Sequence, residues 1–300
     1  MAADHGGVAH RRDLRARGVT RADVRSEVTA GRWELAGIHT VVIGTGPISA
    51  DGARWRAVWE SGSGAVLDGL SALHAAGLTG FTSTVVEVSL PMSCRRRTCP
   101  GVRATRRRTI GPLAGAGIPR VKPEYAALRA ADEARSHRAA ALILCLTLQQ
   151  RLTRPDRVLA AWHQVGRSRR RRVLDALIRD LCDGAQSLGE LDFGVLCRRE
   201  GLPSPSRQVV RTAPGGRIYL DVAWEDIGLV VEVDGGHHAL ALNPVDDALR
   251  QNEVSLGGDV VLRVPVLGLR LGPAAFMAQV VRAHGLFADR RRERDAEGAA

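Results

Sequence analysis

Two apolar-rich runs, 218–223 and 229–233, each interrupted by one acidic residue, predict a pair of β-strands in the last third of the chain. Between them, residues 225–228 include Asp226 and Gly228 and supply a turn, so the two strands form a hairpin. One face of this hairpin carries only aliphatic side chains, which predicts that it packs on a core: Leu220, Val222, Val231 and Val233.

The other face of the predicted hairpin carries acidic side chains. A turn centred between Asp226 and Ile227 sets Asp221 directly opposite Glu232, and the alternation of faces brings Asp234 to the same side. Carboxylates crowded in this way repel one another unless a cation or bound protons neutralise them. The pattern therefore predicts that a cation or shared protons compensate this acidic face.

The segments around the hairpin predict a compact α/β domain over residues 185–288. A capping pair, Ser187 and Glu190, opens a helix that Gly201 ends. The further elements are a strand at 207–211, a helix at 246–256, a strand at 259–264 and a helix at 273–285. Residues 289–300 are expected to be a disordered tail.

The N-terminal segment, residues 1–48, has the pattern of two short helices followed by a hairpin at 33–43. Thr20 with Asp23 three residues later marks a helix start, and Gly18 and Gly31 punctuate the helices. This order resembles the winged helix-turn-helix of AbiEi-type antitoxins from type IV toxin–antitoxin systems. The resemblance implies DNA contacts and a cognate toxin as a candidate partner. Three arginines are candidates for the nucleic-acid contacts: Arg21, Arg25 and Arg32. A small packing domain whose arginines are merely solvated is the alternative.

Residues 49–184 predict a mostly helical connecting domain, with one alternating run at 84–90 that is typical of a strand. An arginine-rich run at 167–172 leads into the last helix of this region. Arg169 and Arg170 are candidates for phosphate contacts there, although a charge run on a helix is also typical of a solvated face.

Composition adds a partner class and a compartment. The 43 Lys and Arg residues outnumber 32 Asp and Glu residues, giving a formal net charge of +11, which favours a polyanionic partner. Five cysteines, an odd number, indicate a reducing compartment. The start of the chain has no apolar run, and the longest apolar stretch, 139–148, is too short to span a bilayer, so we expect a cytoplasmic protein without membrane contact.

The ordered set of C-terminal motifs resembles a family of unknown function allied to the very-short-patch-repair (Vsr) endonucleases of the PD-(D/E)XK superfamily. It comprises Glu190, 202–205, 219–221, 231–235, His237, Asp247 with Arg250, and 261–264. The resemblance implies a restriction-endonuclease-like mixed sheet flanked by helices. It also implies Asp221 and Glu232 as ligands of Mg²⁺ or Mn²⁺, joined by the Val233 carbonyl, with Glu190 as a helix-borne acid and Arg250 as a nucleic-acid contact. The activity it implies is metal-dependent hydrolysis of phosphodiester bonds in DNA.

Two positions depart from that pattern. Asp234 stands where the superfamily has a catalytic Lys, and Gln251 stands where an acid is expected. Either His237 or His238 replaces the Lys, or the site no longer cuts and the protein is a DNA-binding, antitoxin-like regulator that keeps an inactive nuclease fold. The sequence leaves open DNA against RNA, the target and the oligomeric state. It carries no motif for nucleotide hydrolysis, dinucleotide binding or serine hydrolase chemistry.

Overall fold

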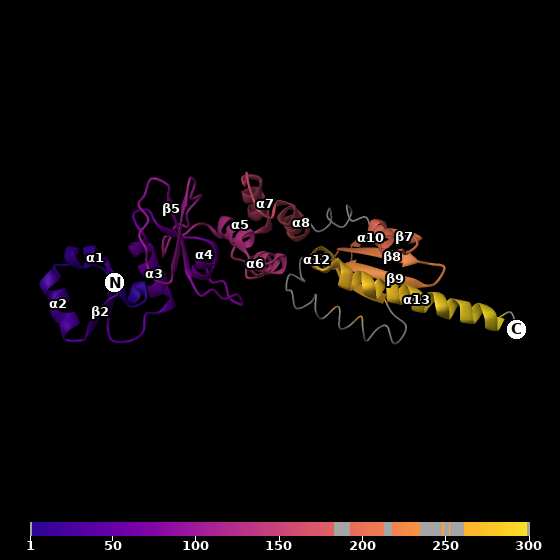
Figure 1. The fold of residues 1–300 in the computed structure, drawn as a ribbon, viewed down its shortest axis with the longest axis horizontal. Helices are drawn as coiled ribbons and strands as arrows, with labels where there is room; N and C mark the ends of the chain where they lie inside the picture. The colour runs from indigo at the N-terminus through magenta and orange to yellow at the C-terminus, as the bar shows by residue number, and fades with distance from the viewer. Residues whose placement is uncertain are drawn as a thin grey trace. The chain divides into compact units, whose positions relative to one another are not determined.

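The chain is a mixed α/β protein. The computed structural model describes residues 2–182, 193–212, 218–234, 248, 252 and 261–298. In this part of the chain the strands form three sheets, with the orders β1-β3-β2, β4-β5-β6 and β10-β9-β8-β7 (Figure 1). The fold divides into two compact units, the first made of residues 1–130 and 150–154 and the second of residues 131–149 and 155–300.

The first unit begins with a three-stranded sheet and two helices. After the 3-10 turn η1 (Ala3–His5), the order is β1 (Val8–His10), α1 (Arg11–Ala16), α2 (Arg21–Thr29), β2 (Trp33–Leu35) and β3 (Thr40–Ile43). β3 lies between β1 and β2 and is antiparallel to both. Apolar positions on one side of each element meet in a small core, formed by Ala9, Leu14, Val24 and Val41.

Local signals in the sequence explain where α2 lies. The Thr20 hydroxyl accepts a hydrogen bond from the Asp23 amide, and the Asp23 carboxylate accepts one from the Thr20 amide, which is the predicted capping pair. Gly18 and Gly31 flank the helix with φ angles of 85° and 70°, a conformation that favours glycine. The two helices and the hairpin after them were therefore correctly predicted.

A second sheet completes the first unit. The elements are α3 (Ala50–Ser61), β4 (Val66–Leu67), α4 (Gly69–Ala75), β5 (Val86–Pro91), β6 (Val102–Arg107) and the start of α5 (Pro123–Glu133). β5 is antiparallel to β4 and parallel to β6. The sequence predicted helices in this region and, of its three strands, β5 alone, so the connecting segment contains more sheet than its sequence suggested.

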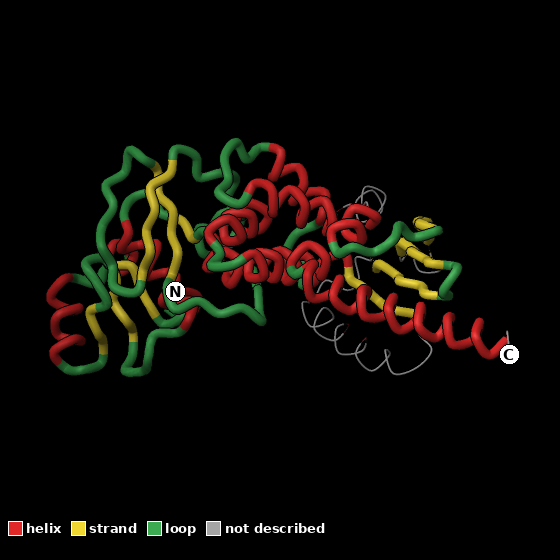
Figure 2. Tube along the Cα trace, turned by 45° about the vertical axis from the view of Figure 1, so that its right-hand side comes forward, coloured by secondary structure: helices red, strands yellow, loops and turns green. Residues whose placement is uncertain are grey.

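The second unit combines helices with the four-stranded sheet (Figure 2). Over the described ranges its helices are the end of α5, α6 (His137–Gln149), α7 (Pro155–His163), α8 (Arg171–Cys182), α10 (Phe193–Arg199), α12 (Val266–Leu271) and α13 (Pro273–Gly298). Its strands are β7 (Arg207–Thr212), β8 (Ile218–Trp224), β9 (Leu229–Asp234) and β10 (Val261–Pro265). β7, β8 and β9 run antiparallel in sequence order, and β10 is parallel to β9.

Part of the core of the second unit lies between this sheet and α13. Val222, Val231 and Val233 are fully buried, as predicted for the aliphatic face of the hairpin. The ring of Trp224 meets His284 of α13 edge-on at 5.5 Å, and the Trp224 indole donates to the Pro203 carbonyl.

One expectation about the end of the chain is corrected. Residues 289–298 were expected to be disordered, but α13 continues through Gly298. Ion pairs at helical spacing join Asp289 to Arg292 and Arg291 to Asp295, and such pairs stabilise an exposed helix. No helix in the part of the chain described is both long and apolar enough to cross a membrane.

Candidate functional site

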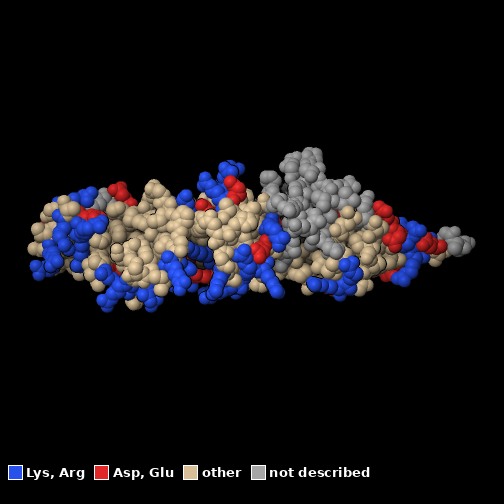
Figure 3. All heavy atoms as spheres, turned by 90° about the horizontal axis from the view of Figure 1, so that it is seen from above, with Lys and Arg blue, Asp and Glu red and all other residues tan. Residues whose placement is uncertain are grey.

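A groove lined by arginines lies between α1, α2 and the β2–β3 hairpin. Arg21 and Arg25 are four residues apart on α2, so their exposed side chains share one helix face. Three arginines of α1 line the same groove, which has a volume of about 760 Å³: Arg11, Arg12 and Arg15. Figure 3 shows Lys and Arg side chains gathered over α1 and α2. The groove therefore concentrates positive charge in one concave place.

Several of these guanidinium groups have unused donors. Arg21 and Arg25 have no ion-pair partner within the described ranges. The Arg11 Nε is buried and has no hydrogen-bond partner there either. Arg12 is the one groove arginine with an ion pair to a described residue, the neighbouring Asp13 at 3.0 Å. Because a guanidinium carries five N–H donors and a fixed charge, this set suits an anion with several acceptor oxygens.

The other predicted arginine of this segment, Arg32, is not among the groove residues. Its Nε and Nη2 donate to the two carboxylate oxygens of Glu27, each at 2.7 Å. This bidentate hydrogen bond raises the pKa of Arg32 and lowers the pKa of Glu27. The sequence did not separate Arg32 from Arg21 and Arg25, because the pairing spans five residues across the end of α2.

Two histidines, His10 and His39, also line the groove near the start of α1. The His10 Nδ1 accepts a hydrogen bond from the Arg12 amide at 2.9 Å and so caps α1. The His39 and His10 rings are nearly parallel, with their centroids 5.6 Å apart. The Arg97 guanidinium lies in hydrogen-bonding contact with the His39 Nε2. Burial lowers the pKa of His10 below its ordinary value, so the neutral form that can act as a cap is favoured.

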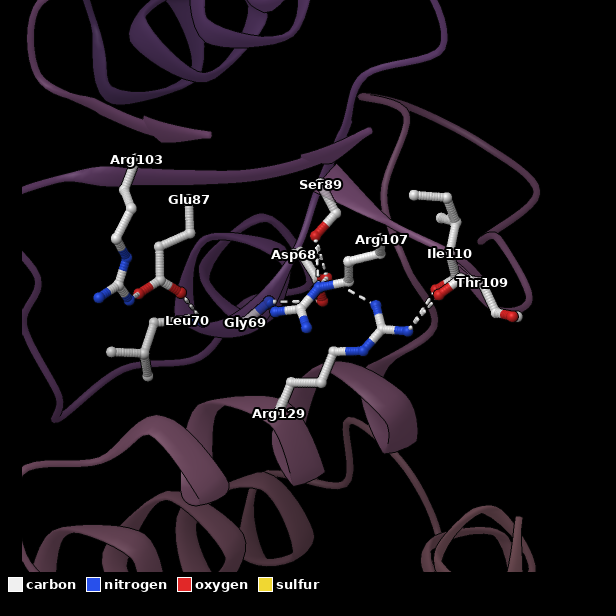
Figure 4. A network of polar contacts seen from close by, with 10 residues as sticks. All are labelled: Asp68, Gly69, Leu70, Glu87, Ser89, Arg103, Arg107, Thr109, Ile110 and Arg129. Atoms are coloured by element: carbon white, nitrogen blue, oxygen red, sulfur yellow. Dashed lines mark hydrogen bonds and ion pairs between the residues drawn. The ribbon is translucent and has the colours of Figure 1, made fainter. Parts of the chain in front are cut away.

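A buried carboxylate, that of Asp68, joins the β4-β5-β6 sheet of the first unit to the helices beside it (Figure 4). Asp68, only 3% exposed, caps α4 by accepting from the Gly69 amide at 2.8 Å. The other oxygen of Asp68 accepts hydrogen bonds from the Ser89 hydroxyl at 2.5 Å and from the Arg129 Nη1 at 2.6 Å. The Arg107 Nε forms an ion pair with the same oxygen at 3.3 Å. Every partner is internal, so we assign this network a structural role.

The second predicted basic cluster lies at the start of α8, in the second unit. Arg169 is exposed, whereas Arg170 is half-buried and its guanidinium donates to the Ala134 carbonyl. The next residue, Arg171, lies over the Trp162 ring at 4.5 Å. Arg170 and Arg171 therefore hold this part of the unit together, and Arg169 alone of the predicted pair is open to solvent.

The acidic face of the predicted hairpin forms with the predicted register. Asp221 on β8 is the direct cross-strand partner of Glu232 on β9, and both side chains are half-buried. Their strands are antiparallel, so the two carboxylates share one face of the sheet. Asp234 ends β9, but its side chain lies outside the described part, as do all atoms of Glu190, His237 and Arg250.

An arginine side chain that was not predicted from the sequence also lies at this acidic face. Arg263 on β10 is the register partner of Glu232, and its Nε lies 3.5 Å from the Glu232 carboxylate. The buried Asn252 fixes the Arg263 backbone, donating to its carbonyl at 3.0 Å and accepting from its amide at 3.1 Å. The contact could not be deduced from the sequence alone because it depends on the parallel pairing of β10 with β9.

The fit of a divalent cation to this face is partial. Asp221 and Glu232 offer the oxygen ligands that Mg²⁺ prefers, but Arg263 must release Glu232 before a cation can take its place. Val233 buries its side chain on the opposite face, and the role of its carbonyl as a ligand stays a prediction. Over the described ranges, no group of three or more His, Cys, Asp or Glu side chains could hold a metal ion.

Comparisons with known proteins give little further guidance. No known protein-family profile matches the chain, and no curated protein matches it. Among solved structures it is similar to the RV2827C protein from Mycobacterium tuberculosis, with 17% sequence identity and a TM-score of 0.40. That similarity covers 71% of this chain and 86% of the other. The likeness is too distant to assign a fold or a function to this chain.

Proposed function

We propose that this protein binds duplex DNA through the arginine-lined groove of its first 48 residues. The observation that carries the proposal is the set of five arginines around one groove, of which Arg21 and Arg25 have no acidic partner in the described part of the chain. Phosphate oxygens along a DNA strand match several guanidinium donors at once.

The arrangement of the elements supports the same proposal. Two helices, a hairpin and a sheet of order β1-β3-β2 are what a winged helix-turn-helix requires, with α2 as the helix that presents side chains to the major groove. Arg21 begins α2 and Arg25 lies at its centre, and the N-terminal part of such helices is where recognition residues are expected. The resemblance to antitoxin winged helices rests on the same elements.

The experiment is a titration of the full-length protein against a fluorescein-labelled duplex of about 20 base pairs at several salt concentrations. Binding through arginine–phosphate contacts predicts that affinity falls by orders of magnitude between about 50 and 200 mM salt. Failure to bind any duplex, or an affinity that salt does not change, would rule the proposal out.

A second candidate function is metal-dependent hydrolysis of DNA by the second unit. The specific observation in its favour is the pairing of Asp221 with Glu232 on one sheet face. A bound Mg²⁺ or Mn²⁺ would neutralise the phosphate and activate a water molecule. Asp221 and Glu232 would hold that ion, and Arg263 would exchange from Glu232 to another anion. A non-catalytic, antitoxin-like regulator remains the alternative.

A cleavage assay with duplex and single-stranded DNA, with and without Mg²⁺ or Mn²⁺, separates these two functions. The nuclease proposal predicts cleavage that depends on the cation and falls at least about a hundredfold in Asp221→Asn and Glu232→Gln variants. Glu225→Gln is a matched control, because this exposed acid lies in the turn after β8. DNA binding without cation-dependent cleavage would leave the regulator as the function.

A further inference from the structure

The turn between β2 and β3 displays an apolar side chain at the rim of the arginine-lined groove. Ile38 is 69% exposed and Leu35, at the end of β2, is 49% exposed. Both residues line the groove together with the arginines of α1 and α2. Exposed large apolar residues beside a concave, charged site are typical of a surface that contacts a partner, so this turn is a candidate contact surface.

A buried carboxylate on α3 fixes the shape of the turn. Glu60, 6% exposed, accepts hydrogen bonds from the amides of Ile38 at 3.0 Å and His39 at 2.8 Å, and from the Thr40 hydroxyl at 2.7 Å. Three donors on one carboxylate define a single backbone conformation for the turn. Ile38 is therefore held in its exposed position.

Two further contacts support that conformation. The Arg56 Nε donates to the Ala36 carbonyl at 2.7 Å. At Gly37 a Cβ atom would lie 2.4 Å from the Glu60 carboxyl carbon, so a larger residue would displace the carboxylate that holds the turn. Such an ordered turn loses little conformational entropy when it binds a partner, which favours affinity.

We propose that Ile38 is an apolar contact point for duplex DNA, touching sugar and base edges beside the phosphates that the groove arginines hold. This inference rests on the proposed DNA binding. The charge of the groove selects a polyanion, and the apolar rim requires that this polyanion carry apolar surface close to its phosphates. In DNA the deoxyribose carbons, the base edges and the thymine methyl group meet that requirement.

The proposal separates two kinds of contact by their dependence on salt. An arginine that neutralises a phosphate releases counterions, so its loss lowers the slope of log affinity against log salt. An apolar side chain releases none. Removing the Ile38 side chain therefore lowers affinity at every salt concentration and leaves that slope unchanged.

The test compares Ile38→Ser with Leu113→Ser, which removes another exposed apolar side chain, 47% exposed, that is not among the groove residues. Using the labelled duplex, we expect Ile38→Ser to lower affinity about tenfold with an unchanged salt slope, and Leu113→Ser to bind like the parent protein. An Ile38→Ser affinity within about twofold of the parent, or a lowered slope, would overturn the proposal.

Glu60→Gln tests the turn as a positioning device, with thermal unfolding as a check that the variant is folded. Both oxygens of the Glu60 carboxylate accept hydrogen bonds from the turn, whereas the NH₂ group of a glutamine side chain cannot accept one. We therefore expect the turn to become less ordered and the affinity for duplex DNA to fall. The double variant Glu60→Gln/Ile38→Ser is expected to bind no more weakly than Ile38→Ser, because the same contact is already lost. Additive losses would contradict the positioning role.

These outcomes also separate the inference from the function beneath it. If the parent protein binds no duplex, the proposed function and the role of Ile38 fail together. If the parent binds with a steep salt dependence while Ile38→Ser is unaffected, DNA binding stands and only the apolar contact is lost.

Discussion

His10 is the residue at which the groove is expected to respond to pH. Burial, which has the largest effect, lowers its pKa in the folded protein, as do Arg12 and His39, while Asp13 and Glu60 raise it. The unfolded chain, with a His pKa of about 6.5, takes up the proton first as the pH falls. Stability contributed by neutral His10 is therefore present above about pH 6.5 and is lost below it.

A variant that caps α1 without titrating tests this expectation. His10→Asn places a side-chain oxygen acceptor at the helix start in place of the His10 Nδ1, so the variant should lose less unfolding free energy than the parent between about pH 7 and pH 5. The measurement is urea unfolding at both pH values, with the difference between parent and variant as the readout. Equal pH dependence in the two proteins would show that His10 is not the titrating group.

Single residues also show how far sequence reasoning reached. Arg21, Arg25 and Arg32 were equivalent as candidates, and only the three-dimensional position of Glu27 separates Arg32 from the other two. Glu60 carried no sequence signal, because its three donors lie about twenty residues away. Partners that are distant in sequence are set by packing, which local patterns do not encode.

At the scale of elements, the Asp68 network links α4, β5, β6 and α5 within the first unit. An Asp68→Asn change leaves the Arg107 and Arg129 charges without their shared carboxylate in a mostly buried place. Breaking a buried ion pair from one side costs about 3–5 kcal/mol. We therefore expect the free energy of unfolding of this unit to fall by roughly that amount.

Asp51→Asn is the matched control, because Asp51 pairs with Arg54 on the surface, where its side chain is 62% exposed. Exposed pairs contribute about 1 kcal/mol or less, so the control should unfold nearly as the parent does. Urea unfolding followed by circular dichroism measures both variants. Equal loss in the two would mean that the network around Asp68 does not hold the unit together.

Elements with strong local signals were predicted and those without were not. The capping pair at Thr20 located α2, and alternation with a short turn gave the β8–β9 register that pairs Asp221 with Glu232. β1 has three residues, too few for a periodic pattern. β6 carries Arg103, Arg106 and Arg107, which is unusual for a strand, and the acids that pair with Arg103 and Arg107 are distant in sequence: Glu87 of β5 and Asp68 at the start of α4.

At the scale of the whole molecule, positively charged side chains at the candidate sites of the two units differ in whether they lie beside an acidic side chain. In the first unit, the arginines of α1 and α2 share a groove, and Arg21 and Arg25 have no acidic partner in the described part of the chain. In the second unit, Arg263 lies against Glu232, so positive and negative charges partly compensate. The net charge of +11 is in keeping with a polyanionic partner, and the arginines that share the groove are the reason why we propose the first unit as its binding place.

The most direct test of that claim compares the salt dependence of duplex binding in Arg25→Ala and Arg32→Ala variants of the full chain. Both changes remove one positive charge, but Arg25 faces the groove and Arg32 is held by Glu27. We predict that Arg25→Ala lowers the slope of log affinity against log salt by about 1 and that Arg32→Ala leaves it near the parent value. Equal slopes in all three proteins, or a larger change in Arg32→Ala, would contradict DNA binding through this groove.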